Sequence, residues 1–240
     1  HASHSGIYGG AVPDAMLAAI RLLDTLWDAD GSVAVAGLTS HDGPTPERSE
    51  DQLREEAALL EGVRSIGTGS VLSRQWFQPS ITITGMDAPS VADASNTLLP
   101  EVAVRVSARI APGQSAQEAF DAIRAHLERH APFGAHLDVS DVDLGEPVLV
   151  DVDGWAAGDA QAAMAEAWGA EPVLQGIGGS IPFIAQLVSQ FPAAQILVTG
   201  VEDPETMAHS PNESQHLGVL RKAILAEAAL LARANARPVR

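Results

Sequence analysis

The side chains of this sequence that suit chemistry lie in short motifs spread along its length. His4 stands between two serines near the N-terminus, and His209 lies in the loop sequence GVEDPETMAHSPNES. Imidazole nitrogens bind zinc, but a zinc site needs three or four ligands. Each histidine is therefore either a metal ligand or a polar loop residue, and only the presence of further ligands would distinguish the two.

The glycine-rich stretch GIGGSIPF carries a second group of candidates, Gly178, Gly179 and Ser180. Free backbone N–H groups and the Ser180 hydroxyl before a helix could bind an anion at the positive helix end. The stretch lacks the lysine of a P-loop and does not fit the dinucleotide-binding spacing. An ordinary turn between a strand and a helix therefore stays open as the alternative.

Arg109 and Asn96 form a third group, near a run that alternates apolar with polar residues. The planar guanidinium of Arg109 can hold a substrate carboxylate, or it can simply be solvated on a strand. Asn96 either contacts a ligand or caps its own backbone. His126 and His130, four residues apart on an expected helix, have a zinc-binding spacing without the H-E-x-x-H order, so they alternatively face solvent or complement the helix dipole.

Composition excludes several functions. The chain has 240 residues, 31 acidic against 14 basic ones, a formal charge of −17 and no cysteine. Such a charge repels nucleic acid and anionic lipid, and any metal must be held by imidazole and carboxylate groups. With no long apolar run and no signal-peptide pattern, we expect a soluble, cytoplasmic protein. The glycine-rich start without an initiator methionine suggests a fragment, a processed chain or a tagged protein.

The elements that position these motifs differ between the two parts of the chain. In the first part the spacing predicts helices from Pro13 and from two capping boxes, at Ser49 with Gln52 (to about residue 63) and at Ser115 with Glu118 (to about residue 130). Alternation predicts strands over 79–86, 101–110 and 135–145. Two helices on one face of a small antiparallel sheet make a ferredoxin-like α/β sandwich, which we place at 1–146.

The second part, 147–240, has short apolar runs that alternate with helices. Strands are predicted over 148–152 and 195–200. Helices are predicted over 158–168, up to residue 191, and from about residue 215. This pattern indicates a piece of a parallel or mixed α/β sheet that is incomplete as it stands.

Taken together, the motifs HSGIYGGAVPDA, NTLLPEVAVRVSARIAPGQ, GGSIP and HSPNE resemble a zinc metallopeptidase family. It includes carnosine-type dipeptidases, carboxypeptidase G, aminoacylase and the acetylornithine and succinyl-diaminopimelate deacylases, and the likeness is greatest to the dipeptidase branch. The resemblance implies a catalytic domain with two zinc ions. It also implies an inserted ferredoxin-like lid through which two subunits pair.

The resemblance also implies roles for single residues. His209 matches the last zinc ligand of the family, and His4 matches a lid histidine that reaches into the partner subunit's site and stabilises the oxyanion. The residues that match substrate-binding positions are Asn96, Arg109, Gly178, Gly179 and Ser180. We therefore expect a dipeptide or N-acyl amino acid as substrate and a homodimer as the assembly.

The sequence departs from the family pattern in its other zinc ligands, which lie upstream of the lid. HDG at 41–43 has the wrong spacing for a ligand pair, and Glu55-Glu56 falls in an exposed helix. We therefore expect the C-terminal half of a dinuclear-zinc metallopeptidase, one that binds zinc weakly or not at all by itself and is inactive alone. Two alternatives stay open: a non-catalytic dimerisation or peptide-terminus-binding module, and an α/β protein in which these are ordinary turn and surface residues.

Overall fold

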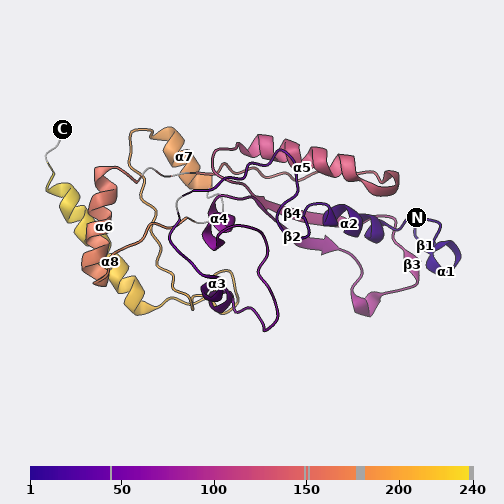
Figure 1. The fold of residues 1–240 in the computed structure, drawn as a ribbon, viewed down its shortest axis with the longest axis horizontal. Coiled ribbons are helices and arrows are strands. Elements are labelled where there is room, and N and C mark those ends of the chain that lie inside the picture. The colour runs from indigo at the N-terminus through magenta and orange to yellow at the C-terminus, as the bar shows by residue number, and fades with distance from the viewer. Residues whose placement is uncertain (44, 149, 151, 177–181, 238–240) are drawn as a thin grey trace. The chain divides into compact units, whose positions relative to one another are not determined.

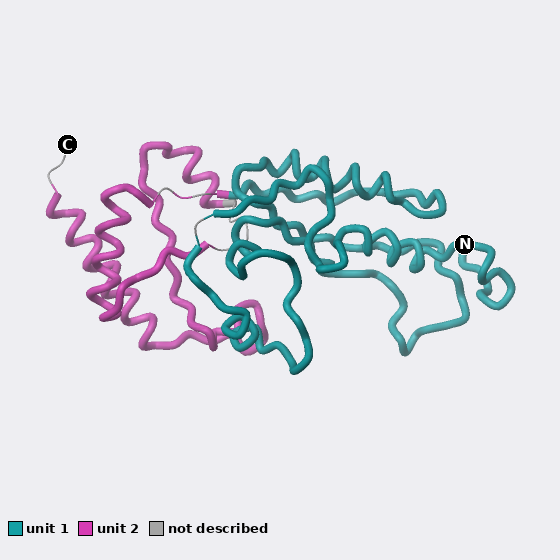
Figure 2. The backbone as a smooth tube through the Cα atoms, in the orientation of Figure 1, with its two compact units in different colours: residues 1–147, 177–182 teal, residues 148–176, 183–240 magenta. Residues whose placement is uncertain are grey.

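The computed structural model describes residues 1–43, 45–148, 150, 152–176 and 182–237, and the chain forms two compact units (Figures 1 and 2). Unit 1 comprises residues 1–147 and 177–182, and unit 2 comprises residues 148–176 and 183–240. Every β-strand of the described residues lies in unit 1. The fold is therefore mixed α/β, and the sheets of the described ranges are confined to one unit.

The main sheet of unit 1 is an antiparallel pair, β2 (Ser80–Asp87) and β4 (Ala103–Arg109). The first residue of β2 lies opposite the last residue of β4, so the two strands form a hairpin with a long connection. An irregularity in register falls between Ile83 and Gly85. Both strands fall where alternation predicted them, because β-branched residues on one face of each strand are covered while the other face is exposed.

Two helices cover this sheet, α2 (Ala15–Asp24) and α5 (Ala116–His130). The core between them contains Leu26, Val35 and Ile81, and Leu26 is fully buried. Partly buried side chains of both helices and both strands surround these three residues. The two-helix layer on an antiparallel sheet was predicted, although the sheet beneath it has two strands only among the described residues.

A second small sheet pairs β1 (Ser3–His4) with β3 (Thr97–Leu98). Helix α1 (Ser5–Tyr8) follows β1 directly, and the 3₁₀ helix η1 (Val91–Asp93) lies shortly before β3. These short elements belong to the connection at the tip of the β2–β4 hairpin and to the N-terminus that returns to it (Figure 1). Their pairing joins parts of the chain more than 90 residues apart.

The segment between α2 and β2 contains α3 (Glu50–Glu56) and α4 (Val71–Trp76). The capping box of Ser49 and Gln52 is present as predicted. The helix ends at Glu56 and not near residue 63, because Ala58 takes a left-handed backbone conformation with φ of 49°.

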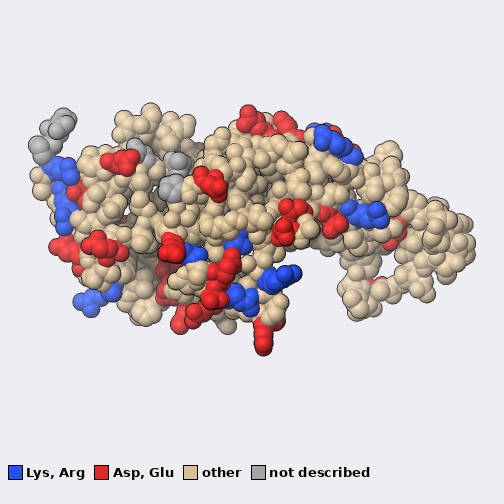
Figure 3. Space-filling model, viewed as in Figure 1, with Lys and Arg blue, Asp and Glu red and all other residues tan. Residues whose placement is uncertain are grey.

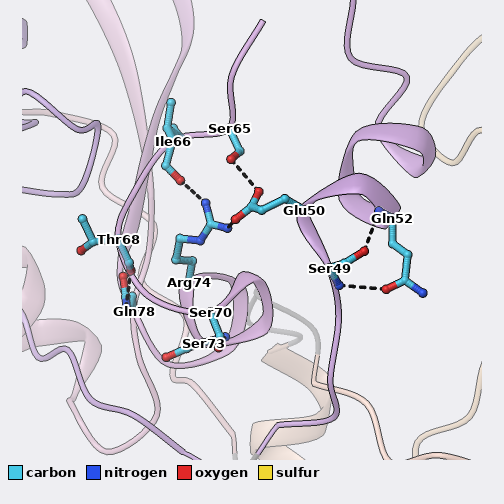
Figure 4. A network of polar contacts seen from close by, with 10 residues as sticks. All are labelled: Ser49, Glu50, Gln52, Ser65, Ile66, Thr68, Ser70, Ser73, Arg74 and Gln78. Atoms are coloured by element: carbon cyan, nitrogen blue, oxygen red, sulfur yellow. Dashed lines mark hydrogen bonds and ion pairs between the residues drawn. The ribbon is translucent and has the colours of Figure 1, made fainter.

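Polar contacts hold this segment together (Figure 4). The largely buried guanidinium of Arg74 donates to the carbonyl of Ile66 at 2.6 Å and forms an ion pair with Glu50. The Ser65 hydroxyl donates to the other oxygen of Glu50 at 2.7 Å. This hydrogen bond and the charge of Arg74 hold the pKa of Glu50 below its ordinary value. The contacts therefore tie α3, α4 and the loop between them into one substructure.

Unit 2 contains α6 (Trp155–Trp168), most of α7 (Pro182–Gln190) and α8 (Leu217–Asn235). Helices α6 and α8 pack on each other through small residues, since Ala163 is fully buried and Ala226 nearly so. Arg237 strengthens this packing through a bidentate pair with Asp159 at 2.7 and 3.0 Å. The α6–α8 pair is thus the organised part of this unit.

Two predicted strands, over 135–145 and over 195–200, are wrong. Residues 135–145 form no strand, and Asp141 breaks their alternation with φ of 51°. The described residues of 148–152 and 195–200 form no strand either, and Leu149 and Asp151 lie outside the described residues. Within the described part of unit 2, the backbone amides of 195–201 donate to no other backbone group. A strand needs a neighbouring strand to bond its backbone groups, so apolar alternation alone cannot produce one.

None of the helices in the described ranges has the length and apolar character that a membrane crossing requires.

Candidate functional site

His4 and Asn96, predicted as site residues from distant motifs, lie at one corner of unit 1. The pairing of β1 with β3 places His4 opposite Thr97. The backbone N–H of Ser5 then donates to the carbonyl oxygen of Asn96 at 2.9 Å. Because both side chains are exposed, they are free to contact a ligand or a second protein. We refer to residues 3–6 and 96–99 as the His4 corner.

The backbone around His4 fixes the tautomer of its ring. The N–H of Gly6 donates to Nδ1 of His4 at 3.0 Å, so Nδ1 acts as an acceptor. A neutral imidazole carries its one proton on the other nitrogen, so Nε2 of His4 is a hydrogen-bond donor. A Cβ atom at position 6 would lie only 3.0 Å from Cε1 of His4, so glycine leaves room for the ring in this orientation. The corner therefore presents an exposed N–H donor.

Exposed apolar residues flank this donor. Ile7 is 71% exposed, and Tyr8 and Val12 are 48% and 44% exposed. On the face shown in Figure 3, uncharged side chains cover most of the end of unit 1 that carries α1 and β3. Exposed apolar side chains that gather beside polar groups often mark a site of interaction with another molecule.

Arg109 lies elsewhere in unit 1, at the end of β4 that is opposite Ser80 and remote from the hairpin tip. A strand rises about 3.3 Å per residue, so the run from Ala103 to Arg109 spans roughly 20 Å. A dipeptide is about 7 Å long when extended. A dipeptide therefore cannot reach from Ala103 to Arg109, and the β1–β3 sheet that carries His4 lies beyond the Ala103 end of β4 (Figure 1).

The side chain of Arg109 is available for an anion. It is exposed, and among the described residues its guanidinium takes part in no ion pair or hydrogen bond. Arg105, on the same strand, is also exposed and lies beside Gly85. Arg105 and Arg109 are therefore both exposed on β4 and differ only in their position along the strand.

His209 lies in unit 2, in a loop that is held together by its own hydrogen bonds. Buried Thr206 accepts through its side chain from the N–H of Asp203 at 2.9 Å, and its carbonyl accepts from the N–H of Ser214 at 3.0 Å. Met207 and His209 both take left-handed conformations, with φ of 53° and 64°. Such conformations in non-glycine residues are uncommon and concentrate at functional sites. The exposed ring of His209 is thus held on a defined loop.

The zinc ions implied by the resemblance do not fit the described residues of this chain by themselves. Across the described ranges, no three histidine or acidic side chains converge on a point that could hold a metal. His209 accordingly brings one ligand where a zinc ion needs three or four. The predicted anion-binding residues Gly178, Gly179 and Ser180 lie outside the described residues.

His126 is not at the surface, where helix-end histidines were expected. It is 6% exposed, and its Nε2 lies 3.0 Å from the hydroxyl oxygen of Thr25. The Thr25 hydroxyl donates to the carbonyl of Leu22 at 2.6 Å, so Nε2 of His126 must be the donor in their contact. Burial lowers the pKa of His126, and the stacked ring of His130 lowers it further. His126 therefore joins α5 to the end of α2, and the two histidines belong to no metal site within the described part of the chain.

Comparison with known proteins identifies the class of domain. Residues 1–135 match the peptidase dimerisation domain of the M20 family. A cysteinylglycine-S-conjugate dipeptidase of Corynebacterium striatum is 32% identical over 95% of this chain and 51% of its own length.

Two solved structures share the fold. The dipeptidase Dug1p of Saccharomyces cerevisiae matches with a TM-score of 0.81 and 20% identity, over 99% of this chain and 52% of its own. In sequence, the Cys-Gly metallodipeptidase DUG1 of that yeast is 24% identical over 52% of this chain and 28% of its own. Human carnosine dipeptidase 1 matches with a TM-score of 0.79 and 20% identity, over 96% of this chain and 51% of its own.

Unit 1 is thus a peptidase dimerisation domain in its sequence and in its two-helix, antiparallel-sheet core. The chain belongs to the M20 peptidase family, as its motifs predicted. It spans about half the length of the dipeptidases of C. striatum and of the two solved structures.

Proposed function

We propose that this chain supplies the dimerisation domain and the C-terminal part of the catalytic domain of a zinc-dependent dipeptidase or related amidohydrolase. The domains are proposed at 1–146 and 147–240. The substrates are dipeptides or N-acyl amino acids, whose amide bond is hydrolysed. Support comes from the family membership of the chain and from the metallodipeptidases among its relatives.

The observation that carries the proposal is the separation of His4 from Arg109 along the β2–β4 hairpin. Since one small substrate cannot reach both ends of β4, each active site would take its donors from two chains. The His4 corner would enter the site of the partner, and Arg109 would serve the site of its own chain. This arrangement makes a homodimer necessary for activity.

Within such a site the residues of this chain have distinct tasks. Nε2–H of His4 would donate to the oxyanion that develops on the scissile carbonyl, and Asn96 would hold the substrate backbone. Arg109 would bind the terminal carboxylate, together with Gly178, Gly179 and Ser180. A carboxylate clamp of this kind restricts hydrolysis to chain ends.

Zinc would supply the activated water and polarise the carbonyl when bound, and His209 is the ligand that this chain offers. Since the described residues bring no further ligands together, the chain alone should not hold a dinuclear site. If the missing ligands are supplied by no other polypeptide, the chain would instead be a dimerisation or peptide-terminus-binding module.

The test co-expresses this chain with the part of the C. striatum dipeptidase that lies outside the matched region, and measures zinc-dependent hydrolysis of Cys-Gly. We expect turnover that falls at least a hundredfold in His4→Gln and in His209→Ala. Arg109→Ala should raise KM for substrates with a free carboxylate, whereas the matched control Arg105→Ala should not.

Calorimetric zinc titration of the chain alone completes the test. Weak or absent binding is expected, and any binding should be lost in His209→Ala. Two tight zinc equivalents, or turnover that survives both histidine substitutions, would contradict the proposal. Binding of peptide carboxylates by the chain without hydrolysis in the co-expressed protein would favour the non-catalytic module.

A further inference from the structure

Asp14 links the His4 corner to helix α2. Oδ1 of Asp14 accepts from the N–H of Met16 at 3.2 Å, which makes Asp14 the N-cap of the helix. The same oxygen also accepts from the N–H of Leu99 at 3.0 Å. The N–H of Ala15 returns a bond to the carbonyl of Leu99 at 3.0 Å. Both backbone groups of Leu99 are therefore fastened to the start of α2.

The fastening matters because the sheet next to it is very short. β1 and β3 contain two residues each, and such a pair is marginal without outside support. Leu99 follows β3 directly, so its attachment to α2 fixes the strand that faces His4. Asp14 bonds to Leu99 at one end of this small sheet. The Ser5–Asn96 and Gly6–His4 hydrogen bonds lie at its other end.

A side chain that caps a helix has to accept a hydrogen bond only from the first turn of that helix. The bond of Asp14 to Leu99, 85 residues away, is not needed for capping. Ser115 caps α5 through its hydroxyl, which accepts from the N–H of Glu118 at 3.2 Å. Its contacts stay within the first turn of the helix and do not reach the His4 corner. Asp14 differs from this cap by its second bond, to Leu99.

We propose that Asp14 is a positioning residue for His4: it holds β3 against β1 and so keeps the His4 ring oriented with Nε2–H exposed. The inference rests on the proposed role of His4 as an oxyanion donor. Asp14 itself is not placed against the substrate and acts only through the backbone of Leu99.

The experiment compares Asp14→Ala, Asp14→Asn and Ser115→Ala in the full 240-residue chain by NMR. Amide hydrogen exchange of Ser5 is measured because Ser5 does not contact Asp14. The ¹⁵N and ¹³C shifts of the His4 ring report its tautomer. In Asp14→Ala we expect exchange at Ser5 to be at least tenfold faster and the His4 signals to show both tautomers.

The two other variants separate positioning from capping. Asp14→Asn keeps an oxygen at the Oδ1 position, so exchange at Ser5 should stay within about threefold of the original and the Nε2–H tautomer should persist. Ser115→Ala removes a comparable cap and should lower thermal stability without changing either signal. Unchanged Ser5 exchange and an unchanged His4 tautomer in Asp14→Ala would overturn the inference and reduce Asp14 to a helix cap.

These measurements need neither zinc nor substrate. The positioning role can therefore fail while the hydrolysis assay succeeds, or hold while that assay fails.

Discussion

Units 1 and 2 both contain many apolar residues but are organised differently. Unit 1 closes a core around Leu26 from two helices and an antiparallel hairpin that is local in sequence. Unit 2 pairs α6 with α8, while its apolar segment 195–201 forms no backbone hydrogen bonds to other described backbone groups. Unit 1 nearly coincides with the match to the dimerisation domain at residues 1–135. A hairpin satisfies its own backbone, whereas strands of a parallel or mixed sheet depend on neighbours from elsewhere.

The largest effect should come from breaking the core of unit 1. Leu26→Ala removes a fully buried side chain, and large-to-small core substitutions cost about 2–5 kcal/mol of unfolding free energy. Urea unfolding followed by circular dichroism measures the change. Leu60→Ala, at a side chain 76% exposed in the same unit, should change the free energy by less than about 0.5 kcal/mol. Equal effects of the two substitutions would show that Leu26 is not at the centre of the core.

Acid should affect unit 1 through the buried His126. Its pKa is lowered in the folded state, so the unfolded chain binds the extra proton more readily. Stability is therefore full above the unfolded pKa of about 6.5 and is lost as the pH falls through that value toward the lowered folded one. The groups around the ring are His130 and Arg129 on α5 and Thr25 at the end of α2.

Thermal unfolding between pH 8 and pH 5 tests this dependence. His126→Gln keeps a side-chain N–H donor for Thr25 but cannot titrate, so part of the loss of melting temperature at low pH should disappear. His136→Gln, at an exposed loop residue of the same unit, should leave the pH profile unchanged. Identical profiles for the original chain and His126→Gln would contradict the prediction.

The smallest effect should come from the side chains that join α6 to α8. Arg237 pairs with Asp159, holds the pKa of that carboxyl below its ordinary value, and lies 4.6 Å from the centre of the Trp155 ring. Arg237→Ala should speed amide hydrogen exchange at the end of α8 and leave unit 1 unaffected. Arg124→Ala, in an exposed pair with Glu128, should change neither unit. Faster exchange throughout both units after Arg237→Ala would show that they do not unfold separately.

Local signals explain what the sequence predicted well. Capping boxes at Ser49 and Ser115 lie within one helical turn, so their residues determine the helix starts by themselves. The alternation of β2 and β4 predicted their extent because each strand has one covered face. The family motifs gave the class of protein.

Long-range contacts explain what could not be predicted. The bond of His126 to Thr25 joins residues 101 apart, and that of Asp14 to Leu99 joins residues 85 apart. The position of Asp14 just before the apolar spacing of α2 signals an N-cap, but no spacing rule signals its second bond. Likewise, alternation over 135–145 could not show that no strand would lie beside it.

The length of the β2–β4 hairpin is itself a structural variable. If His4 and Arg109 act as proposed, the length of the hairpin sets the spacing between them, and the alternation of its side chains permits changes of two residues at a time. Adding two residues to each strand would preserve both faces and lengthen the hairpin by about 7 Å. A single added residue would instead turn the remainder of a strand over, unless a second irregularity like the one near Gly85 absorbed it. Descendants of this fold could therefore change the length of this hairpin most readily in steps of two residues.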